Sequence, residues 1–581
     1  MVDAKPLLGP MPLRLPRLPW VEAAAQIALR QAGIEGFGTP GYELTLAYPK
    51  AEGFAAAPRD FRPTDRAIGR GALTGRFFFA GSSLDVPPGA DPWNRPSPSK
   101  PFAIELHRFA WLPHLLALGE PGAREALRLI RAWPEIFGRW QPFAWGREVL
   151  ARRVYNLAAG SRRLAQAGTE EDAAVLADML ARQARHLLRL PDDRAWAAEH
   201  TAAAAVAGAA LAGPAGEKLL KRALPRLRRA LGRSVLPDGC HASRSPEAGL
   251  ELLLDLLTLD DALLQRGQEA PPELGRAIDR LTVALRTLTL ADGRLACFQG
   301  GEAASSARLA AARAHDDPEG AVPAALPDGR YHRLQGQLLQ VMVDAGAPAR
   351  GAYAQTACAQ PLALEVVCGR DRLITNCGWS PREPDRQGFR LTPAGSTVTL
   401  GEGSVLEPLQ GRLSRILGAR LEGPAFRVEG RRHETDGAVW VDLAHDGWAQ
   451  PYGLAHERRL YLDIRADELR GEDRLVRIEG AKPRALAAPY ALRFHLHPEV
   501  QVSMARDRKS VLLRGPSGRG WWFRNDAAEV SIEPGAWFEA GAPRKASQIV
   551  LRGVARTDGL TRVRWKVTPA AGGVSESERL A

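Results

Sequence analysis

Apolar residues recur at intervals of three and four positions along the first half of the chain. Eight segments between residues 102 and 290 have this spacing: 103–118, 122–133, 147–167, 170–188, 196–212, 217–235, 247–265 and 274–288. The spacing places apolar side chains on one face of an α-helix. Short turns holding Gly, Pro or Asp separate the segments, so the helices are expected to pack antiparallel, either as a layered bundle or as a closed ring of hairpins.

The pattern changes after Leu295. Residues 300–329 are rich in Ala, Gly and Pro and are expected to form a flexible connector. Short β-rich runs follow Tyr331, at 338–343, 362–368, 397–400, 439–443, 459–464, 492–497, 511–513, 521–524, 530–532, 549–552 and 563–567. Many closely spaced strands with Gly, Asp and Pro turns predict a β-sandwich or barrel.

The first hundred residues lack either pattern over most of their length. One amphipathic helix is expected at about residues 20–31, closed by Gly33 and Gly36. Residues 41–100 are rich in Gly, Pro and Asp and are expected to form an extended arm. The predicted organisation is a lead-in helix and arm at 1–100, a helical domain at 101–330 and a β-sandwich at 331–581.

The charge of the chain adds one functional indication. The net charge is +12, and only nine of the 78 basic residues are Lys. A GC-rich genome explains much of this Arg bias, and an acidic partner is the other explanation, because guanidinium groups match carboxylate, sulfate and phosphate bidentately. An acidic polysaccharide fits this pattern better than nucleic acid, since no basic stripe interleaved with aromatic residues and no nucleic-acid-reading module is visible.

Other sequence features exclude several classes of protein. The five cysteines lack paired spacing and are expected to be free thiols. The N-terminal twenty residues lack the unbroken apolar stretch of a secretory signal, which predicts a cytoplasmic location. No apolar run approaches membrane-spanning length, and no Gly-rich phosphate loop follows a predicted strand.

Seven segments, in order along the chain, carry a resemblance to a known family. They are LHRFAWL (106–112), WGREVLARRVYN (145–156), LPDGCHASRSPEAGLELLLDL (236–256), ITNCG (374–378), HDGW (445–448), HERRLYL (456–462) and RFHLHP (493–498). Their order and their placement across both predicted domains resemble the heparinase II/III-like polysaccharide lyases. The resemblance implies an N-terminal (α/α) toroid of helical hairpins followed by a C-terminal antiparallel β-sandwich, and a periplasmic location as the alternative to the cytoplasm.

The chemistry implied by this resemblance is β-elimination on a uronic-acid-containing anionic polysaccharide, either heparin-like or a bacterial acidic glycan. A base removes the proton next to the uronate carboxylate, which is neutralised by Asn, His or Arg, and the β oxygen leaves. The family's Asn-His helix signature matches Glu199 and His200, so Glu199 replaces the usual Asn. The signature around Arg244 places Ala248 where the family has its Tyr acid/base.

The structural zinc site of related lyases matches Cys358, Asn376 and Gly395 in this chain. Zinc needs several anionic or imidazole ligands that converge on one point, and this set supplies at most one good ligand. We therefore expect no zinc and no other cofactor.

The candidate catalytic residues are His200, His241 and His445. The candidate substrate-binding residues are Trp145, Arg152, Arg153, Asn156, Arg244, Tyr452, His456 and Arg458. For each of these there is a structural alternative: a helix histidine bonded to a carbonyl, an ordinary charged helix face, or a histidine of the sheet without a catalytic role.

Two other functions remain open. The substitutions at the zinc positions and at Ala248 favour a catalytically degenerate carbohydrate-binding protein on the same fold. A toroid-type glycoside hydrolase would need two facing carboxylates, and Glu199, Asp238 and Glu247 are the plausible suppliers. The expected partner is an anionic polysaccharide, with no nucleic acid and no membrane span. Which polysaccharide binds and the oligomeric state are not encoded in any motif.

Overall fold

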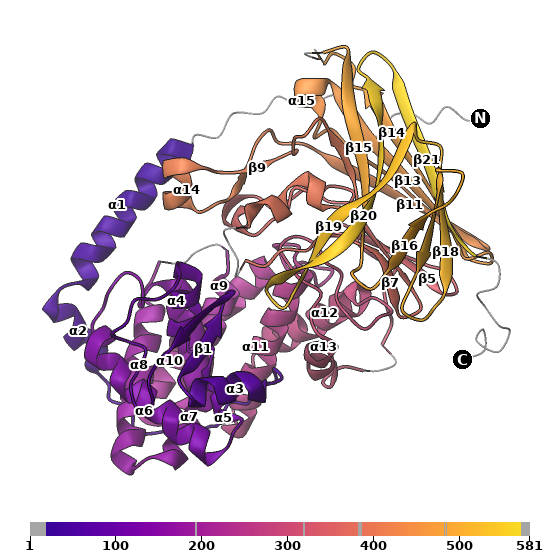
Figure 1. The fold of residues 1–581 in the computed structure, drawn as a ribbon. Helices are drawn as coiled ribbons and strands as arrows, with labels where there is room; N and C mark the ends of the chain where they lie inside the picture. Colours follow the sequence, from indigo (N-terminus) through magenta and orange to yellow (C-terminus); the bar gives the residue numbers. More distant parts are fainter. Residues whose placement is uncertain are drawn as a thin grey trace.

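A computed structural model describes residues 19–570, except 192–194, 318–319, 382–385, 482 and 484. Helices dominate the first half and strands the second (Figure 1). This architecture confirms the predicted fold class of a helical toroid domain followed by an antiparallel β-sandwich. The prediction about a secretory signal concerns residues that lie mostly at 1–18, outside the described residues.

The helices of the toroid domain follow the apolar periodicity closely. They are α4 (Lys100–His107), α5 (Leu112–Leu116), α6 (Glu120–Phe137), α7 (Arg147–Ala167), α8 (Glu170–Leu187), α9 (Ala197–Ala210), α10 (Gly213–Ser234), α11 (Pro246–Gln265), α12 (Pro272–Leu288) and α13 (Ser306–Arg313). Side-chain caps fix several of the starts: Thr169 and Asp172 form a reciprocal capping box at α8, and Ser245 caps α11. Helix α13 lies in the segment that was expected to be a flexible connector.

The segment predicted as one helix at 103–118 is two helices, because the chain turns between them. Phe109 has a left-handed backbone with φ of 57°, which ends the first helix. The amide of Asn156 on α7 donates to the carbonyls of Arg108 and Phe109, at 3.0 and 3.3 Å. A buried side chain therefore satisfies the carbonyls that the break leaves without helical partners.

Helix α9 is the centre of the toroid domain. Its sequence, AAEHTAAAAVAGAA, is rich in alanine, and it packs against α7, α8, α10 and α11. Small side chains allow this close approach: a Cβ on Gly208 would lie 3.0 Å from the backbone nitrogen of Leu220. Only the first turn of the helix leaves the core, and it holds Glu199 and His200.

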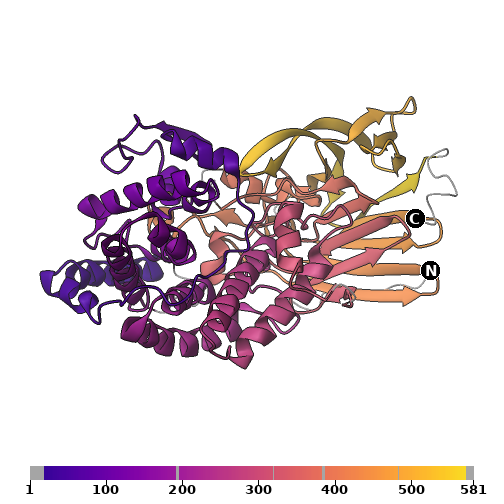
Figure 2. The ribbon, with the colours of Figure 1, turned by 90° about the horizontal axis from the view of Figure 1, so that it is seen from below.

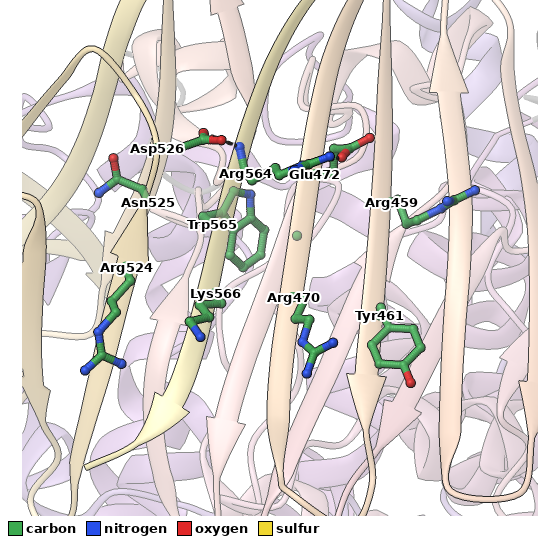
Figure 3. A pocket seen from close by; sticks show the side chains of 11 residues that line it. Arg459, Tyr461, Arg470, Glu472, Arg524, Asn525, Asp526, Arg564, Trp565 and Lys566 are labelled. Atoms are coloured by element: carbon green, nitrogen blue, oxygen red, sulfur yellow. Dashed lines mark hydrogen bonds and ion pairs between the residues drawn. The ribbon is translucent and has the colours of Figure 1, made fainter. Parts of the chain in front are cut away.

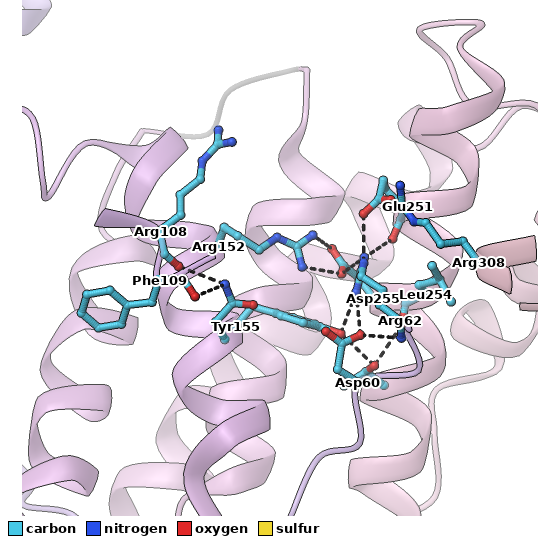
Figure 4. Close-up of polar contacts among 12 residues, drawn as sticks. Asp60, Arg62, Arg108, Phe109, Arg152, Tyr155, Glu251, Leu254, Asp255 and Arg308 are labelled. Atoms are coloured by element: carbon cyan, nitrogen blue, oxygen red, sulfur yellow. Dashed lines mark hydrogen bonds and ion pairs between the residues drawn. The ribbon is translucent and has the colours of Figure 1, made fainter. Parts of the chain in front are cut away.

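The first hundred residues are more structured than an extended arm. They contain α1 (Pro19–Phe37), α2 (Pro40–Ala47), α3 (Arg66–Leu73) and the hairpin β1 (Arg76–Phe79) and β2 (Ser82–Asp85). An ion-pair network holds this segment to the toroid (Figure 4). Arg62 contacts Asp60, Glu251 and Asp255 at 3.0, 3.0 and 2.7 Å.

The sandwich domain has two large antiparallel sheets. The nine-stranded sheet contains β3 (Ala325–Leu326), β4 (Tyr331–Gln335), β5 (Leu339–Asp344), β6 (Leu364–Cys368), β7 (Asp371–Thr375), β8 (Val398–Leu400), β15 (Ala487–Leu496), β19 (Glu529–Glu539) and β20 (Ala542–Arg556). The eight-stranded sheet contains β11 (Val428–Thr435), β12 (Ala438–His445), β13 (Leu454–Asp463), β14 (Glu468–Arg477), β16 (Gln501–Met504), β17 (Ser510–Arg514), β18 (Gly520–Asn525) and β21 (Leu560–Pro569). The short strands β9 (Glu407–Pro408) and β10 (Leu421–Glu422) pair with each other, and α14 (Gly411–Leu417) and α15 (Ala449–Tyr452) lie in loops.

Alternation along the strands sets the two faces of the eight-stranded sheet. Val441, Leu460, Leu469 and Val567 are buried in the core between the sheets, and the residues between them on each strand face outward.

None of the helices described within residues 19–570 has the length and apolar character of a membrane span.

The toroid and the sandwich lie side by side in both views (Figures 1 and 2). Buried charged groups join them: Arg372 of β7 bonds Asp292 at 2.8 Å, and Arg244, in the turn before α11, pairs with Asp344 of β5. At the edge of the contact, Arg294 bonds Glu539 at 2.8 Å. These contacts fix the sandwich loops relative to the toroid helices and so define the geometry of the junction.

Candidate functional site

The start of α9 delivers three polar or aromatic side chains to the domain junction. Trp196 precedes the helix with a left-handed backbone, φ 59°, and Glu199 and His200 occupy the first turn. All three are partly exposed, whereas the rest of α9 is buried. The first turn of α9 is therefore partly exposed at the junction, with both carboxylate oxygens of Glu199 buried.

The turn between α10 and α11 places His241 opposite this helix start. Nε2 of His241 lies 3.1 Å from the Glu199 carboxylate, and Nδ1 lies 2.7 Å from the Ser243 hydroxyl. The turn is tight because Gly239, with φ of 87°, packs against the backbone carbonyl of Arg280, where a Cβ would lie only 1.8 Å away. Nδ1 of His241 is thus hydrogen-bonded to Ser243, and Nε2 faces the Glu199 carboxylate.

The sandwich supplies the third component, Tyr353 in the 3-10 turn η1 (Gly351–Gln355). The rings of Trp196, His241 and Tyr353 contact one another, with centroid distances of 5.4, 5.2 and 5.6 Å. The imidazole stacks on the indole at 24°, and the phenol meets both rings edge-on. We call Trp196, Glu199, His200, His241 and Tyr353 the junction cluster.

The two titratable groups of the α9 turn have opposite electrostatic tendencies. Burial opposes ionisation of Glu199, but the hydrogen bond and charge of His241 outweigh it and lower the pKa of Glu199. Burial is the main cause that lowers the pKa of His200 to about 3, and the charges of Arg147 and Arg108 add to it against the effect of Glu199. At neutral pH the cluster therefore presents a carboxylate beside an uncharged imidazole.

This arrangement can support proton transfer at a bound anion. An ionised Glu199 can accept a proton, the hydroxyl of Tyr353 can donate one, and the neutral His200 can donate a hydrogen bond to a carboxylate. The charges of Arg147 and Arg108 act on His200, and Arg108 itself is paired with Glu105 and Glu148, at 2.7 and 3.0 Å.

Of the predicted site residues, the structure places His241 against Glu199 and His200 beside Glu199 in the first turn of α9. Four others from the toroid are in its interior and bond to protein groups. Trp145 donates to the Phe137 carbonyl at 2.8 Å, and Arg153 is fully buried over the Trp133 ring and bonds Gln183. Arg152 makes two bonds to Asp255, at 3.0 and 3.2 Å (Figure 4). Asn156 donates to the carbonyls between α4 and α5, as described above. These four side chains therefore stabilise the toroid.

Arg244 lies between the domains instead of in an open site. Its guanidinium donates to the carbonyls of Gly329 and Ala347, at 3.0 and 2.9 Å, and pairs with Asp344. The side chain is 8% exposed. Arg244 therefore contributes to domain docking, which positions Tyr353 near His241.

The sandwich histidine group forms a network in the core between the sheets. His456 lies 3.3 Å from Nε2 of His445 and 2.7 Å from Asp473, and Arg458 bonds the same Asp473 oxygen at 2.7 Å. His445, His456 and Arg458 are at most 1% exposed. Tyr452 lies apart from this network, half-buried, and donates to the Leu400 carbonyl. The structure does not bring these four residues to the junction cluster.

The residues at the family's zinc positions do not fit a zinc ion. The Asn376 amide donates to the Cys297 carbonyl and accepts from the backbone N–H of Ser396. Burial raises the pKa of Cys358 to about 11, so its thiol stays protonated, and Gly395 has no side chain. Within the described residues, no group of three or more His, Cys, Asp or Glu side chains is arranged to hold a metal ion.

The carboxylates required for a hydrolase pair are engaged separately. Asp238 accepts from the backbone N–H groups of Cys240, Asp328 and Gly329. Glu247 accepts from the N–H of Glu302 and lies near Arg308. Glu199 alone belongs to the junction cluster, so no contact brings two of the three together.

Trp196 and Tyr353 were not predicted as site residues. Tyr353 lies in a short turn of the other domain, more than a hundred residues from His241, and nothing in the local pattern marks it. A signal for Trp196 was present, because it stands three residues before Glu199 at the start of the predicted helix.

Comparisons with known proteins agree with the fold. Residues 318–566 match the family described as "Heparinase II/III-like, C-terminal". The chain is 48% identical over 543 residues to FtsZ-localized protein C of Caulobacter vibrioides. The matched region covers 93% of this chain and 94% of that protein. The crystal structure of a heparinase III is similar with a TM-score of 0.68 at 12% identity, covering 95% and 94% of the two chains. A mutant of the heparan sulfate lyase HepC from Pedobacter heparinus is similar with a TM-score of 0.58 at 15% identity, covering 92% and 88%.

Proposed function

This chain belongs to the heparinase II/III-like family, and from that premise we propose that it acts on an anionic, uronate-containing glycan by β-elimination at the domain junction. The observation that supports this most directly is the junction cluster. Residues from two turns of the toroid and one turn of the sandwich converge there, near the cations Arg147 and Arg108.

In the proposed reaction, Glu199 accepts the proton on the carbon next to the uronate carboxyl. The carbon–oxygen bond at the β position breaks, and Tyr353 donates a proton to the departing oxygen, which leaves an unsaturated uronate and a shorter chain. His200 donates a hydrogen bond to the uronate carboxylate, whose growing charge the cationic surroundings stabilise. His241 keeps Glu199 ionised and oriented, so it is a positioning residue. Tyr353 takes the role that Ala248 cannot perform.

The test is a screen of uronate-containing and sulfated glycans for the ultraviolet absorbance of unsaturated uronate. We expect Glu199→Gln and Tyr353→Phe to lower kcat by about a hundredfold or more, with intact folding. Tyr452→Phe removes a hydroxyl that donates to the Leu400 carbonyl, away from the junction cluster, and is the matched control. Absence of product from every uronate glycan, or equal loss in all three variants, would exclude the elimination mechanism.

A non-catalytic, carbohydrate-binding role at the same site is the second candidate, favoured by Ala248 and by the lost zinc ligands.

The relative that is 48% identical is named for its localisation with FtsZ, so we propose that this chain also localises with FtsZ. A fluorescent fusion in the native host tests this by its overlap with FtsZ. Overlap together with glycan binding but no unsaturated product supports the non-catalytic role, whereas a signal independent of FtsZ contradicts it.

A further inference from the structure

The outward face of the eight-stranded sheet carries a row of side chains that crosses six neighbouring strands. The register places Arg524 of β18 opposite Lys566 of β21, Lys566 opposite Arg470 of β14, and Arg470 opposite Tyr461 of β13. The row continues through Trp440 and ends at His433. We call Arg524, Lys566 and Arg470 the cation row. Figure 3 shows these three side chains and Tyr461 at one level of the sheet.

The cation row is energetically unusual, because like charges directly opposite one another on neighbouring strands are destabilising. Three successive cations lie within two strand spacings, roughly 10 Å. Glu468 is the acid shared by two of them, at 4.0 Å from Lys566 and in contact with Arg470. Arg524 donates to the Thr568 hydroxyl and lies over the Trp522 ring, and no ion pair with it is found among the described residues.

The adjacent row of the same face differs from the cation row, because positive and negative side chains alternate along it. Arg564, Glu472, Arg459, Asp442 and Arg431 follow one another across five strands with alternating charge. Glu472 bonds Arg564 at 2.9 Å, and Asp442 contacts Arg459. We call this set the alternating row. Four of its five charges form two opposite-charge pairs, so the excess of the cation row is a local feature of the face.

A groove of about 570 Å³ lies along these two rows. Its lining contains the cation row and two acids, Glu472 and Asp526, together with Arg459 and Arg564, whose charges are already paired with Asp442 and Glu472. The side chains of Arg470 and Lys566 are 58% and 45% exposed, so the charges are accessible from the solvent. The chemistry of the groove therefore favours an anion.

The aromatic end of the row decides which class of polyanion fits. Trp440 stacks against His433 on one side, at 5.1 Å and 16°, and faces Tyr461 on the other, at 6.1 Å and 30°. Arg470 covers the Tyr461 ring. The ring faces are thus occupied by neighbours, whereas single-stranded nucleic acid binds by stacking its bases on open faces. An acidic peptide cannot extend the sheet here either, because central strands have paired backbones.

We propose that the cation row and the adjoining rings bind an anionic polysaccharide strand that crosses the β-strands. The carboxylate or sulfate groups of the glycan pair with Arg524, Lys566 and Arg470, and its hydroxyls bond the polar edges of the groove, including Tyr461. The complete row spans five strand spacings, about 24 Å, which accommodates several sugar units. This site is separate from the junction cluster, and it binds glycan whether or not elimination occurs there.

The test compares two double variants of the full chain that each remove two positive charges from the same face. Arg470→Gln with Lys566→Gln changes the cation row, and Arg459→Gln with Arg564→Gln changes the alternating row. Binding of fluorescently labelled heparin and polygalacturonate is measured by anisotropy at two salt concentrations, with neutral dextran as the control ligand. Thermal unfolding verifies that both variants are folded.

We expect the cation-row variant to lose about tenfold or more in affinity, with a weaker salt dependence, and the alternating-row variant to stay within about twofold of the wild type. Equal losses in the two variants, or no loss in either, would overturn the proposal. A single-stranded oligodeoxynucleotide that binds as tightly as the glycans would also overturn it, by indicating an unselective polyanion surface.

The junction site is tested separately by Glu199→Gln. That variant abolishes elimination under the proposed function but leaves the difference between the two row variants unchanged. Absence of a difference between the two row variants, with elimination that depends on Glu199, would therefore reject the surface site alone. Elimination that persists in Glu199→Gln, with an intact difference between the row variants, would reject the junction mechanism alone.

Discussion

Asp473 is predicted to be a main determinant of sandwich stability. Its Oδ1 accepts hydrogen bonds from His456 and Arg458, both at 2.7 Å, and its Oδ2 accepts from the Trp565 indole at 2.8 Å. The carboxylate is 3% exposed. Asp473→Asn keeps the shape of the side chain but leaves the buried Arg458 cation without its anion. Breaking a buried ion pair from one side costs about 3 to 5 kcal/mol, and we expect a loss of that size here.

The measurement is urea unfolding of the full chain, followed by tryptophan fluorescence and analysed transition by transition, because two domains need not unfold together. Asp442→Asn is the matched control, since Asp442 pairs with the half-exposed Arg459 on the outer face of the same sheet. An exposed pair contributes about 1 kcal/mol or less. A loss at Asp473 no larger than at Asp442 would refute the structural assignment and return His445 and His456 to consideration as functional groups.

Three further predictions concern other parts of the molecule. Lys566→Gln relieves repulsion from Arg470 and Arg524, so the free energy of unfolding should stay constant or rise by about 0.2 to 1 kcal/mol; a decrease in urea unfolding contradicts like-charge repulsion in the cation row. Arg244→Met leaves the buried Asp344 carboxylate without its cation, and limited proteolysis should cut the 345–355 segment several times faster than in the wild type; unchanged cleavage contradicts a role of Arg244 in docking. Burial, with the charge of Arg153 added, lowers the pKa of His107 to about 3, and burial lowers the pKa of His495 to about 4, both from 6.5. Below about pH 6.5 the unfolded chain therefore binds more protons than the folded chain. The stability that depends on the neutral His107 and His495 is complete above that pH and falls as the pH drops toward about 4. A urea midpoint that stays constant between about pH 7 and 4.5 contradicts this.

The sequence predicts the fold well because the helices and strands have local causes. Apolar periodicity places α7 and α11 within one residue of their bounds, and caps such as Thr169 mark where helices start. The break at Phe109 is not visible locally, because Asn156, nearly fifty residues later, satisfies the freed carbonyls. Non-local compensation of this kind has no periodic signature.

The candidate site is less predictable for the same reason. His200 and His241 are identified by their motifs, but a charged residue in a motif looks the same whether its partner is a ligand or a buried acid. Arg153 and Arg244 illustrate this, because both are enclosed by protein groups that lie far away in sequence. The cation row is also invisible in sequence, since its three members come from strands at 468–477, 520–525 and 560–569 and meet only through pairing.

Under the proposed function, one glycan site is assembled from both domains around His241 and Tyr353. Hydrogen–deuterium exchange with and without a homogeneous uronate oligosaccharide tests it most directly. We predict simultaneous protection of three segments, 196–201, 238–245 and 351–356, and loss of that protection in Tyr353→Ala. Protection confined to the sandwich, or to sites away from these three segments, would contradict the claim.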